Sequence, residues 1–277
     1  MPYHEYEEVG DKTMNKEQQH QEDLQRLRGF RLIDDDFMNA CFDDNIEGTE
    51  LILRIILNKP NLSVKSVKTQ KVMKNLLGRD IWLDIDATDG DNAELDIEIQ
   101  RADKGADPKR ARYHSSILDA HLLKPNDDFK DLPETYVIFI TENDVIGDNE
   151  PIYIIDRQII TTGKSFNDGE HIIYVNGADK NRATELGKLM HDFFCTNPDD
   201  MHFKQLADRA RYFKEDERGV ATMCKVMEDM RNETAERTKI QSAMNLLKLG
   251  KLSFEEIANA MELSVEKVKE LAMPKTV

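Results

Sequence analysis

The segment that decides the fold is DIWLDIDATDGDNAELDIEIQR, residues 80–101. Apolar and polar residues alternate over 81–86, and the alternation returns over 95–100. Side chains two residues apart share one face of a strand, so each half predicts a β-strand with one apolar and one polar face. The Asp-Gly-Asp-Asn sequence at 89–92 is typical of a chain reversal. The segment therefore predicts an antiparallel hairpin.

Folding this hairpin about its turn places carboxylates opposite one another. Asp84 then faces Glu98, and Asp86 faces Asp96. Facing carboxylates repel across a ladder, and a divalent cation relieves the repulsion because hard cations bind carboxylate oxygens. The alternative is an acidic face exposed to water, which the alternation alone favours. Two observations favour the metal site. The opposite face of the hairpin is wholly apolar, which fixes the register and puts the carboxylates on one side. In addition, Glu98-x-Gln100 ends the second strand and is followed by a basic segment.

The rest of the chain predicts a sheet covered by helices. Residues 136–141, YVIFIT, form a continuous apolar run typical of a buried central strand. Further strands are expected at 63–76, 151–155 and 171–175, and amphipathic helices at 108–122 and 186–193. The predicted fold class is α/β, with a mixed central sheet flanked by helices.

A basic cluster opens the helix that follows the hairpin. A cap residue and a first-turn proline at 107–108 predict where this helix starts. Lys109, Arg110 and Arg112 crowd its first turn, where positive charge is unfavourable unless an anion lies nearby. Phosphate and the hairpin carboxylates are both open as partners. With the adjacent Tyr113, these residues form the predicted nucleic-acid-binding set.

Four segments resemble the Rpn family of recombination-promoting nucleases and transposases: DIEIQRADKGADPKRARYHSSILDAHLL (96–123), LPETYVIFITENDVIG (132–147), HIIYVNGADK (171–180) and LGKLMHDFFCTNPDDM (186–201). An Asp, a turn and Glu-x-Gln at a strand end are also similar to the PD-(D/E)XK nuclease superfamily, with Gln in place of the usual Lys. The resemblance covers about residues 30–230 and is specific as a combination. It implies a PD-(D/E)XK, restriction-endonuclease-like core.

The resemblance also implies a Mg²⁺-dependent DNA endonuclease linked to recombination or mobile elements. Asp84, Glu98 and the carbonyl of Ile99 would hold Mg²⁺, which Mn²⁺ could replace. Gln100 stands where the superfamily has Lys; an amide can orient water but cannot act as a base or carry charge. This departure leaves open a catalytically weak or inactive interaction protein, derived from a mobile element, that keeps the nuclease fold.

Three further residues resemble catalytic groups and have simpler explanations. The first core helix of the superfamily often lends an acidic residue, for which Glu47 and Glu50 are the candidates. For each of them, a solvated acidic residue near the start of a helix is the preferred interpretation. His114 is expected to be a hydrogen-bonded structural residue rather than a base.

The pattern divides the chain into three regions. Residues 1–24 predict a polar tail or loose helix, 25–213 the nuclease-like domain, and 214–277 a helical extension. The extension ends in a capping box at 253–256 and a tight turn at 262–264, which together resemble a helix-turn-helix. Its last helix is poor in base-reading side chains, so we expect packing or homo-oligomer formation rather than DNA reading.

Composition limits the class of protein. The 277 residues carry a net charge of −16 and three scattered cysteines, which suit reduced thiols in a cytoplasmic protein. No apolar run is long enough for a transmembrane helix, so no membrane contact is expected. The acidic sum argues against tight nonspecific DNA binding, but DNA remains the expected partner because binding depends on a local patch.

Overall fold

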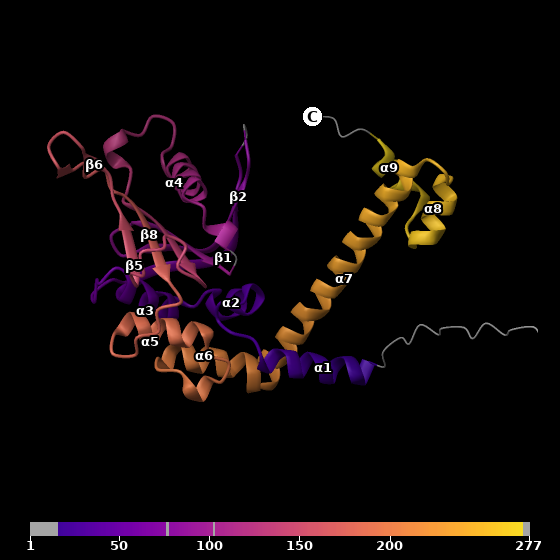
Figure 1. Cartoon of the computed structure of the whole chain (residues 1–277), viewed down its shortest axis with the longest axis horizontal. Coiled ribbons are helices and arrows are strands. Elements are labelled where there is room, and N and C mark those ends of the chain that lie inside the picture. Colours follow the sequence, from indigo (N-terminus) through magenta and orange to yellow (C-terminus); the bar gives the residue numbers. More distant parts are fainter. Residues whose placement is uncertain (1–15, 76–77, 102, 274–277) are drawn as a thin grey trace, which may run out of the picture. The chain divides into compact units, whose positions relative to one another are not determined.

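The predicted hairpin lies within a six-stranded mixed sheet (Figure 1). The computed structural model describes residues 16–75, 78–101 and 103–273. In the order β1-β2-β3-β4-β8-β5, the strands are β1 (Val64–Met73), β2 (Ile81–Asp89), β3 (Glu94–Gln100), β4 (Thr135–Thr141), β8 (Glu170–Asn176) and β5 (Ile152–Ile155). Strands β3, β4 and β8 run parallel, and the other neighbours pair antiparallel. The α/β fold with a mixed central sheet is therefore confirmed.

A short ribbon of β6 (Gln158–Ile159) and β7 (Lys164–Ser165) stands apart from the main sheet. The sequence pattern did not predict it. Its strands are two residues long and exposed, so they carry too little alternation to be seen.

The turn of the β2–β3 hairpin is held by the carboxylate of Asp89. This carboxylate accepts hydrogen bonds from the backbone N–H groups of Asp91 at 2.8 Å and Ala93 at 2.9 Å. An aspartate side chain that accepts hydrogen bonds from the backbone N–H groups following it stabilises a chain reversal. The resulting register places Asp86 opposite Asp96, as the sequence predicted.

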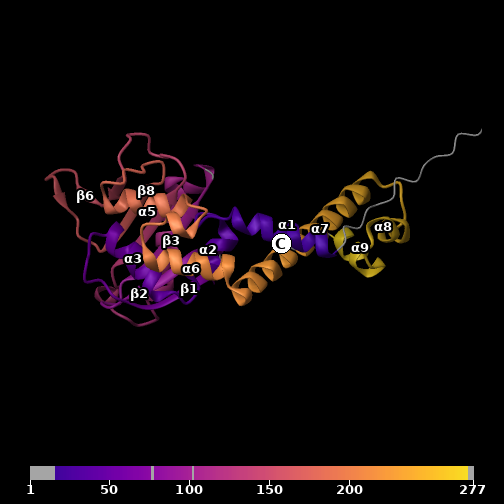
Figure 2. The ribbon, with the colours of Figure 1, turned by 90° about the horizontal axis from the view of Figure 1, so that it is seen from below.

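Helices cover both faces of the sheet. Figure 1 shows α4 on one side of the strands and α2, α3, α5 and α6 on the other, and Figure 2 shows the second group from below. The helices of this part of the chain are α1 (Lys16–Arg28), α2 (Asp35–Phe42), α3 (Ile46–Ile56), α4 (Pro108–Leu122), α5 (Glu185–Phe194) and α6 (Lys204–Glu215). Helix α4 is thus the layer nearest to the predicted site.

The position of α4 follows from its cap and its apolar stripe. The Asp107 carboxylate accepts a hydrogen bond from the Lys109 N–H at 2.7 Å, and a proline occupies the first turn, as predicted. Ala111 and Leu118 are fully buried in one cluster with Phe139 of β4. Burying a large apolar side chain contributes about 1.5–3 kcal/mol, so this contact fixes α4 on the sheet.

The chain divides into two compact units, Met1–Val220 and Ala221–Val277. Helix α7 (Glu217–Leu249) begins in the first unit and continues in the second, which also holds α8 (Phe254–Met261) and α9 (Val265–Ala272). Ser253 and Glu256 form the predicted capping box, and Glu262 adopts φ +51° at the tight turn. Buried side chains of Ala243, Ile257, Ala258 and Val268 form the core of this unit.

The predicted tail, residues 1–24, falls partly outside the described residues. Residues 1–15 are not described, and residues 16–24 belong to α1, whose Leu27 is buried. The domain boundaries at 24/25 and 213/214 stay predictions. No described helix combines the length and the apolar character that crossing a membrane requires.

Candidate active site

Asp84 and Glu98 meet where the hairpin ladder ends. The paired register between β2 and β3 stops at Ile85 and Ile97. Beyond it, the Asp84 carboxylate accepts a hydrogen bond from the Ile99 N–H at 2.8 Å, and the Asp84 N–H donates to the Glu98 carboxylate at 3.3 Å. Side chains therefore join the strands here in place of ladder bonds, and the predicted pair of carboxylates is adjacent.

Three carboxylates of the hairpin, Asp86, Asp96 and Glu98, are buried rather than hydrated. Asp96 and Glu98 are 0% exposed, and Asp86 is 7% exposed. The alternative of a solvated acidic face is wrong for them, because α4 packs over that face and removes the water. Asp86 is neutralised by the Lys71 ammonium of β1 at 2.6 Å.

Burial raises the pKa of three acids of this cluster, Asp84, Glu98 and Asp96. The pKa of Asp84 is raised to about 6, although its bond from Ile99 opposes the shift. The pKa of Glu98 is raised well above its ordinary value by burial and then by the nearby charges of Asp96 and Asp84. The pKa of Asp96 is likewise raised by burial. Burial therefore disfavours the ionised form of each acid, and a positive charge bound nearby favours it.

The donor set fits a hard divalent cation. One carboxylate oxygen of Asp86 and one of Asp96 are buried among the described residues without a hydrogen-bond partner. A buried oxygen without a partner costs about 1–3 kcal/mol, which a bound cation or its water can recover. Asp84, Glu98 and the Ile99 carbonyl offer the oxygen ligands that Mg²⁺ prefers.

His114 of α4 lies against the buried carboxylates of β3. Its Nδ1 lies 2.9 Å from Asp96 Oδ2 and 3.7 Å from Glu98 Oε1, and burial lowers the pKa of His114. Arg110 Nε donates to His114 Nε2 at 3.3 Å, so the proton of the neutral ring sits on Nδ1 and points to Asp96. The geometry matches the predicted hydrogen-bonded residue, and both ring nitrogens are engaged.

Arg110 reaches the centre of the site. Its Nη2 forms an ion pair with Glu98 Oε2 at 2.6 Å, and its Nη1 donates to Gln100 Oε1 at 3.3 Å. Of the two partners left open by the sequence, Arg110 takes the hairpin carboxylate. Its guanidinium therefore places a fixed positive charge beside Gln100, where the superfamily carries a lysine.

Gln100 depends on Gly105 for its place. A Cβ built on Gly105 would lie 1.8 Å from Gln100 Oε1. The Gly105 carbonyl also accepts a hydrogen bond from Arg110 Nη1 at 3.1 Å. Only glycine at this position leaves room for the amide to meet the guanidinium.

A cavity of about 410 Å³ opens beside Asp84 and Gln100, and its lining includes acidic residues that the sequence analysis missed. The full lining is Asp35, Asp84, Ile99, Gln100, Arg101 and Glu142. Asp35 starts α2, and its charge contributes to the raised pKa of Asp84. An acidic run, Asp34-Asp35-Asp36, was the available signal, but such a run also begins many ordinary helices.

The acidic candidates of the first core helix lie elsewhere. The Glu50 carboxylate accepts a hydrogen bond from the Val64 N–H at 2.9 Å and pairs with Arg54 at 2.9 Å. Glu47 lines a separate depression with residues of α6. Both residues therefore lie outside the site. Glu47 is exposed, as the preferred interpretation expects, whereas the Glu50 side chain is only 18% exposed and ties α3 to β1, so the solvated interpretation is wrong for Glu50.

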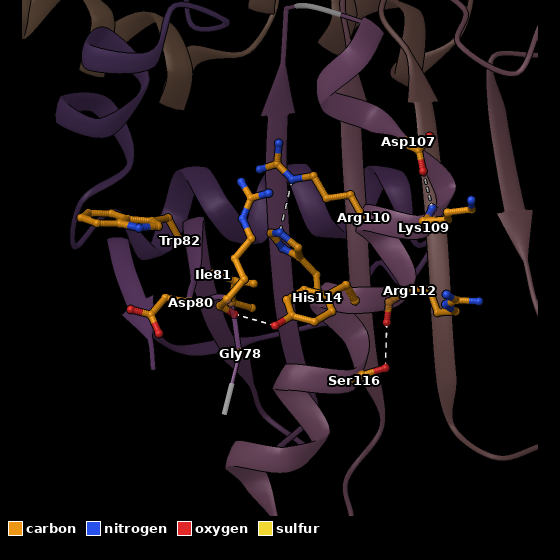
Figure 3. A pocket seen from close by; sticks show the side chains of 12 residues that line it. Gly78, Asp80, Ile81, Trp82, Asp107, Lys109, Arg110, Arg112, His114 and Ser116 are labelled. Atoms are coloured by element: carbon orange, nitrogen blue, oxygen red, sulfur yellow. Dashed lines mark hydrogen bonds between the residues drawn. The ribbon is translucent and has the colours of Figure 1, made fainter. Parts of the chain in front are cut away.

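A separate, larger cleft of about 980 Å³ crosses the first turn of α4, and its lining includes Arg110 and His114, which contact the buried carboxylates (Figure 3). It contains the whole predicted nucleic-acid-binding set, Lys109, Arg110, Arg112 and Tyr113. Figure 3 shows Arg110 directed toward His114, whereas Lys109 and Arg112 point away from it. The cleft also contains Arg79 and Trp82, which the sequence analysis did not select.

One more cluster, His191, Asp192 and His202, has a structural explanation. The Asp192 carboxylate accepts hydrogen bonds from the backbone N–H groups of His202 at 2.8 Å and Phe203 at 2.8 Å. It thereby caps α6, whose own cap residue, Phe203, has no side-chain acceptor.

Comparison with known proteins identifies the family of the chain. The family model described as PD-(D/E)XK nuclease family transposase matches residues 37–249, which include the sheet, the hairpin carboxylates and the α4 cleft. No curated protein and no solved structure matched the chain. Because the match extends over most of the chain, this protein belongs to the PD-(D/E)XK nuclease family transposases.

Proposed function

We propose that the chain is a divalent-metal-dependent DNA endonuclease. The observation that carries the proposal is the adjacency of Asp84 and Glu98, two carboxylates with raised pKa values, next to Arg110, which pairs with Glu98 and also lines a cationic cleft. Stability alone does not explain acids held together out of water, since each would be replaced by an apolar residue at lower cost.

In this proposal, Asp84, Glu98 and the Ile99 carbonyl hold Mg²⁺, with Mn²⁺ as a substitute. The ion, when bound, would polarise a phosphodiester oxygen and lower the pKa of its water. Gln100 uses its amide oxygen to accept from Arg110, so its amide N–H groups are the ones directed to water or phosphate. Arg110 supplies the charge that the amide lacks and stabilises negative charge on phosphate.

Lys109, Arg112 and Tyr113 are proposed to hold the DNA backbone along the cleft. Within the described part of the chain, Lys109 and Arg112 have no carboxylate at ion-pair distance, although the protein is acidic overall. Helix α4 also presents its positive N-terminal end to the cleft, which favours anions.

A second candidate is the catalytically weak or inactive interaction protein that keeps the nuclease fold. The observation that favours it is the ion pair of Arg110 with Glu98 at 2.6 Å. A guanidinium in this place already neutralises the carboxylate, so the site can be stable without a metal ion.

The test is plasmid cleavage with Mg²⁺, Mn²⁺ or EDTA, together with calorimetric titration of Mn²⁺. The wild type should nick plasmid only with a metal ion, and Asp84→Ala should abolish nicking. Glu98→Ala should lose Mn²⁺ binding and the rise in melting temperature that binding produces. Asp91→Ala, which removes an exposed carboxylate of the hairpin turn, is the matched control and should behave as the wild type. Metal binding without cleavage in the wild type would favour the second candidate.

Three finer assignments accompany this proposal. We propose a role in recombination or in mobile elements, a cytoplasmic location, and homo-oligomer formation through the C-terminal helices. Light scattering of the full chain and of a chain ending at residue 249 would test the last of these.

A further inference from the structure

Trp82 is an exposed aromatic ring at the edge of the α4 cleft. It is the only tryptophan of the chain, and 58% of its surface is exposed. It lies two residues before Asp84 on β2, a separation of about 6.6–6.8 Å along a strand. In Figure 3, Trp82 and Lys109 lie on opposite sides of Arg110 and His114, and the Trp82 ring points outward from the edge of the cleft. Among the residues that the structure describes, this exposed indole belongs to no buried cluster.

The cleft that Trp82 borders has an excess of unpaired positive charge. Arg79, Lys109 and Arg112 have no ion-pair partner among the described residues. The two carboxylates of the lining are both engaged. Asp80 pairs with the Lys74 ammonium at 2.8 Å, and Asp107 caps α4.

The other aromatic ring of the cleft is held in place. The Tyr113 hydroxyl donates to the Arg79 carbonyl at 2.6 Å and accepts from Asn75 Nδ2 at 3.0 Å. These bonds tie Tyr113 to the Arg79 backbone. Trp82 is therefore the ring that is free to receive a ligand on its face.

We propose that Trp82 stacks on an unpaired base, and that the site acts on DNA with a single-stranded segment at the scissile phosphate. This inference rests on the proposed function and names its substrate class. Cationic grooves bordered by aromatic rings bind single strands because the ring takes a base face and the cations take phosphates. In a duplex, both faces of a base are covered by its neighbours, so an intact duplex offers no base face to the ring. Trp82 lies two residues from Asp84 on β2, and Arg110 of the same cleft contacts Glu98, so the stacked base is placed next to the phosphate at the carboxylates.

The single tryptophan makes the test direct, because every change in indole emission reports on Trp82. Full-length protein is titrated in EDTA with a single-stranded oligodeoxynucleotide and with its duplex. We expect quenching by the single strand and little by the duplex. Trp82→Leu should weaken single-strand binding by about tenfold, the loss expected for one stacked base, and Trp82→Phe by less. Phe129→Ala removes a ring that is 84% exposed outside the cleft, and should bind as the wild type.

Three results would overturn the inference: unchanged emission on adding the single strand, equal affinity of the wild type and Trp82→Leu, or stronger quenching by duplex or by RNA of the same sequence. The proposed function fails separately. Loss of all metal-dependent cleavage with quenching intact would leave the base-stacking site without a nuclease. Cleavage that depends on Asp84 but not on Trp82 would leave the nuclease without the stacking site.

Discussion

Replacing Arg110 with Gln tests whether this side chain holds the buried acids together. Arg110 pairs with Glu98 at 2.6 Å, and the Glu98 side chain is 0% exposed. Breaking a fully buried pair from one side costs about 3–5 kcal/mol, because the remaining charge has no partner. Since 37% of the Arg110 side chain is exposed, we expect a smaller loss, about 2 kcal/mol. For a unit of this size, that corresponds to a fall of about 4–8 °C in melting temperature.

The penalty should also depend on pH with a defined sign. The pKa of Glu98 is already raised by burial, so its ionised form reduces stability as pH rises. Removing Arg110 takes away a charge that favours ionisation and raises that pKa further. The melting temperature of Arg110→Gln should therefore fall below that of the wild type by more at high pH than at low pH, because the raised pKa of Glu98 favours its protonated form as pH falls.

Arg112→Gln is the matched control, since it removes an exposed guanidinium two residues along the same helix. It should change the melting temperature little and flatten the salt dependence of DNA binding. The double variant Arg110→Gln/Glu98→Gln should recover much of the lost stability, because neither partner is then left charged and alone. Equal losses for Arg110→Gln and Arg112→Gln, or no recovery in the double variant, would refute the reasoning.

The remaining predictions concern the groups around Arg110. Asp84→Asn should stabilise the metal-free protein above pH 6 by up to about 3 kcal/mol, because the Asp84 pKa of about 6 makes ionisation of this carboxyl unfavourable in the folded state. The advantage should disappear as pH falls toward 4. Melting temperatures measured across this pH range check the prediction. Gly105→Ala should displace the Gln100 amide from Arg110 and lower plasmid cleavage with little change in melting temperature; normal cleavage would contradict the contact. Gln100→Lys should keep the fold and leave plasmid cleavage unchanged or higher. In the double variant with Arg110→Gln, the lysine should restore the plasmid cleavage that depends on the Arg110 charge. A complete loss of cleavage by folded Gln100→Lys would show that the amide itself is needed.

Local patterns predicted the parts of this protein that depend on near neighbours in sequence. The alternation at 81–86 and 95–100 gave both strands of the hairpin, and its turn residues gave the register. The cap at 107–108 gave the start of α4. Each of these features is decided by side chains within a few residues, so one sequence contains the information.

Contacts between distant segments were beyond those patterns. Asp35 lines the cavity of Asp84, although 49 positions separate the two residues in the sequence. Arg110 was left with two open partners because the sequence does not say how far α4 tilts over the hairpin. Trp82 was assigned only to a polar face, since alternation does not distinguish an exposed ring from a buried one.

The substitution of Gln100 for lysine is better understood through these distant contacts than through the motif. A lysine on β3 would bring its charge to the site from the same strand as Glu98. Here the charge comes from α4, through the Arg110 guanidinium, which contacts both Glu98 and Gln100. An arginine cannot give up its proton in a protein, so this position can stabilise charge but cannot serve as a base. The arrangement therefore assigns charge stabilisation to Arg110, leaves the orientation of water to Gln100, and makes proton removal depend on a bound metal ion or on solvent.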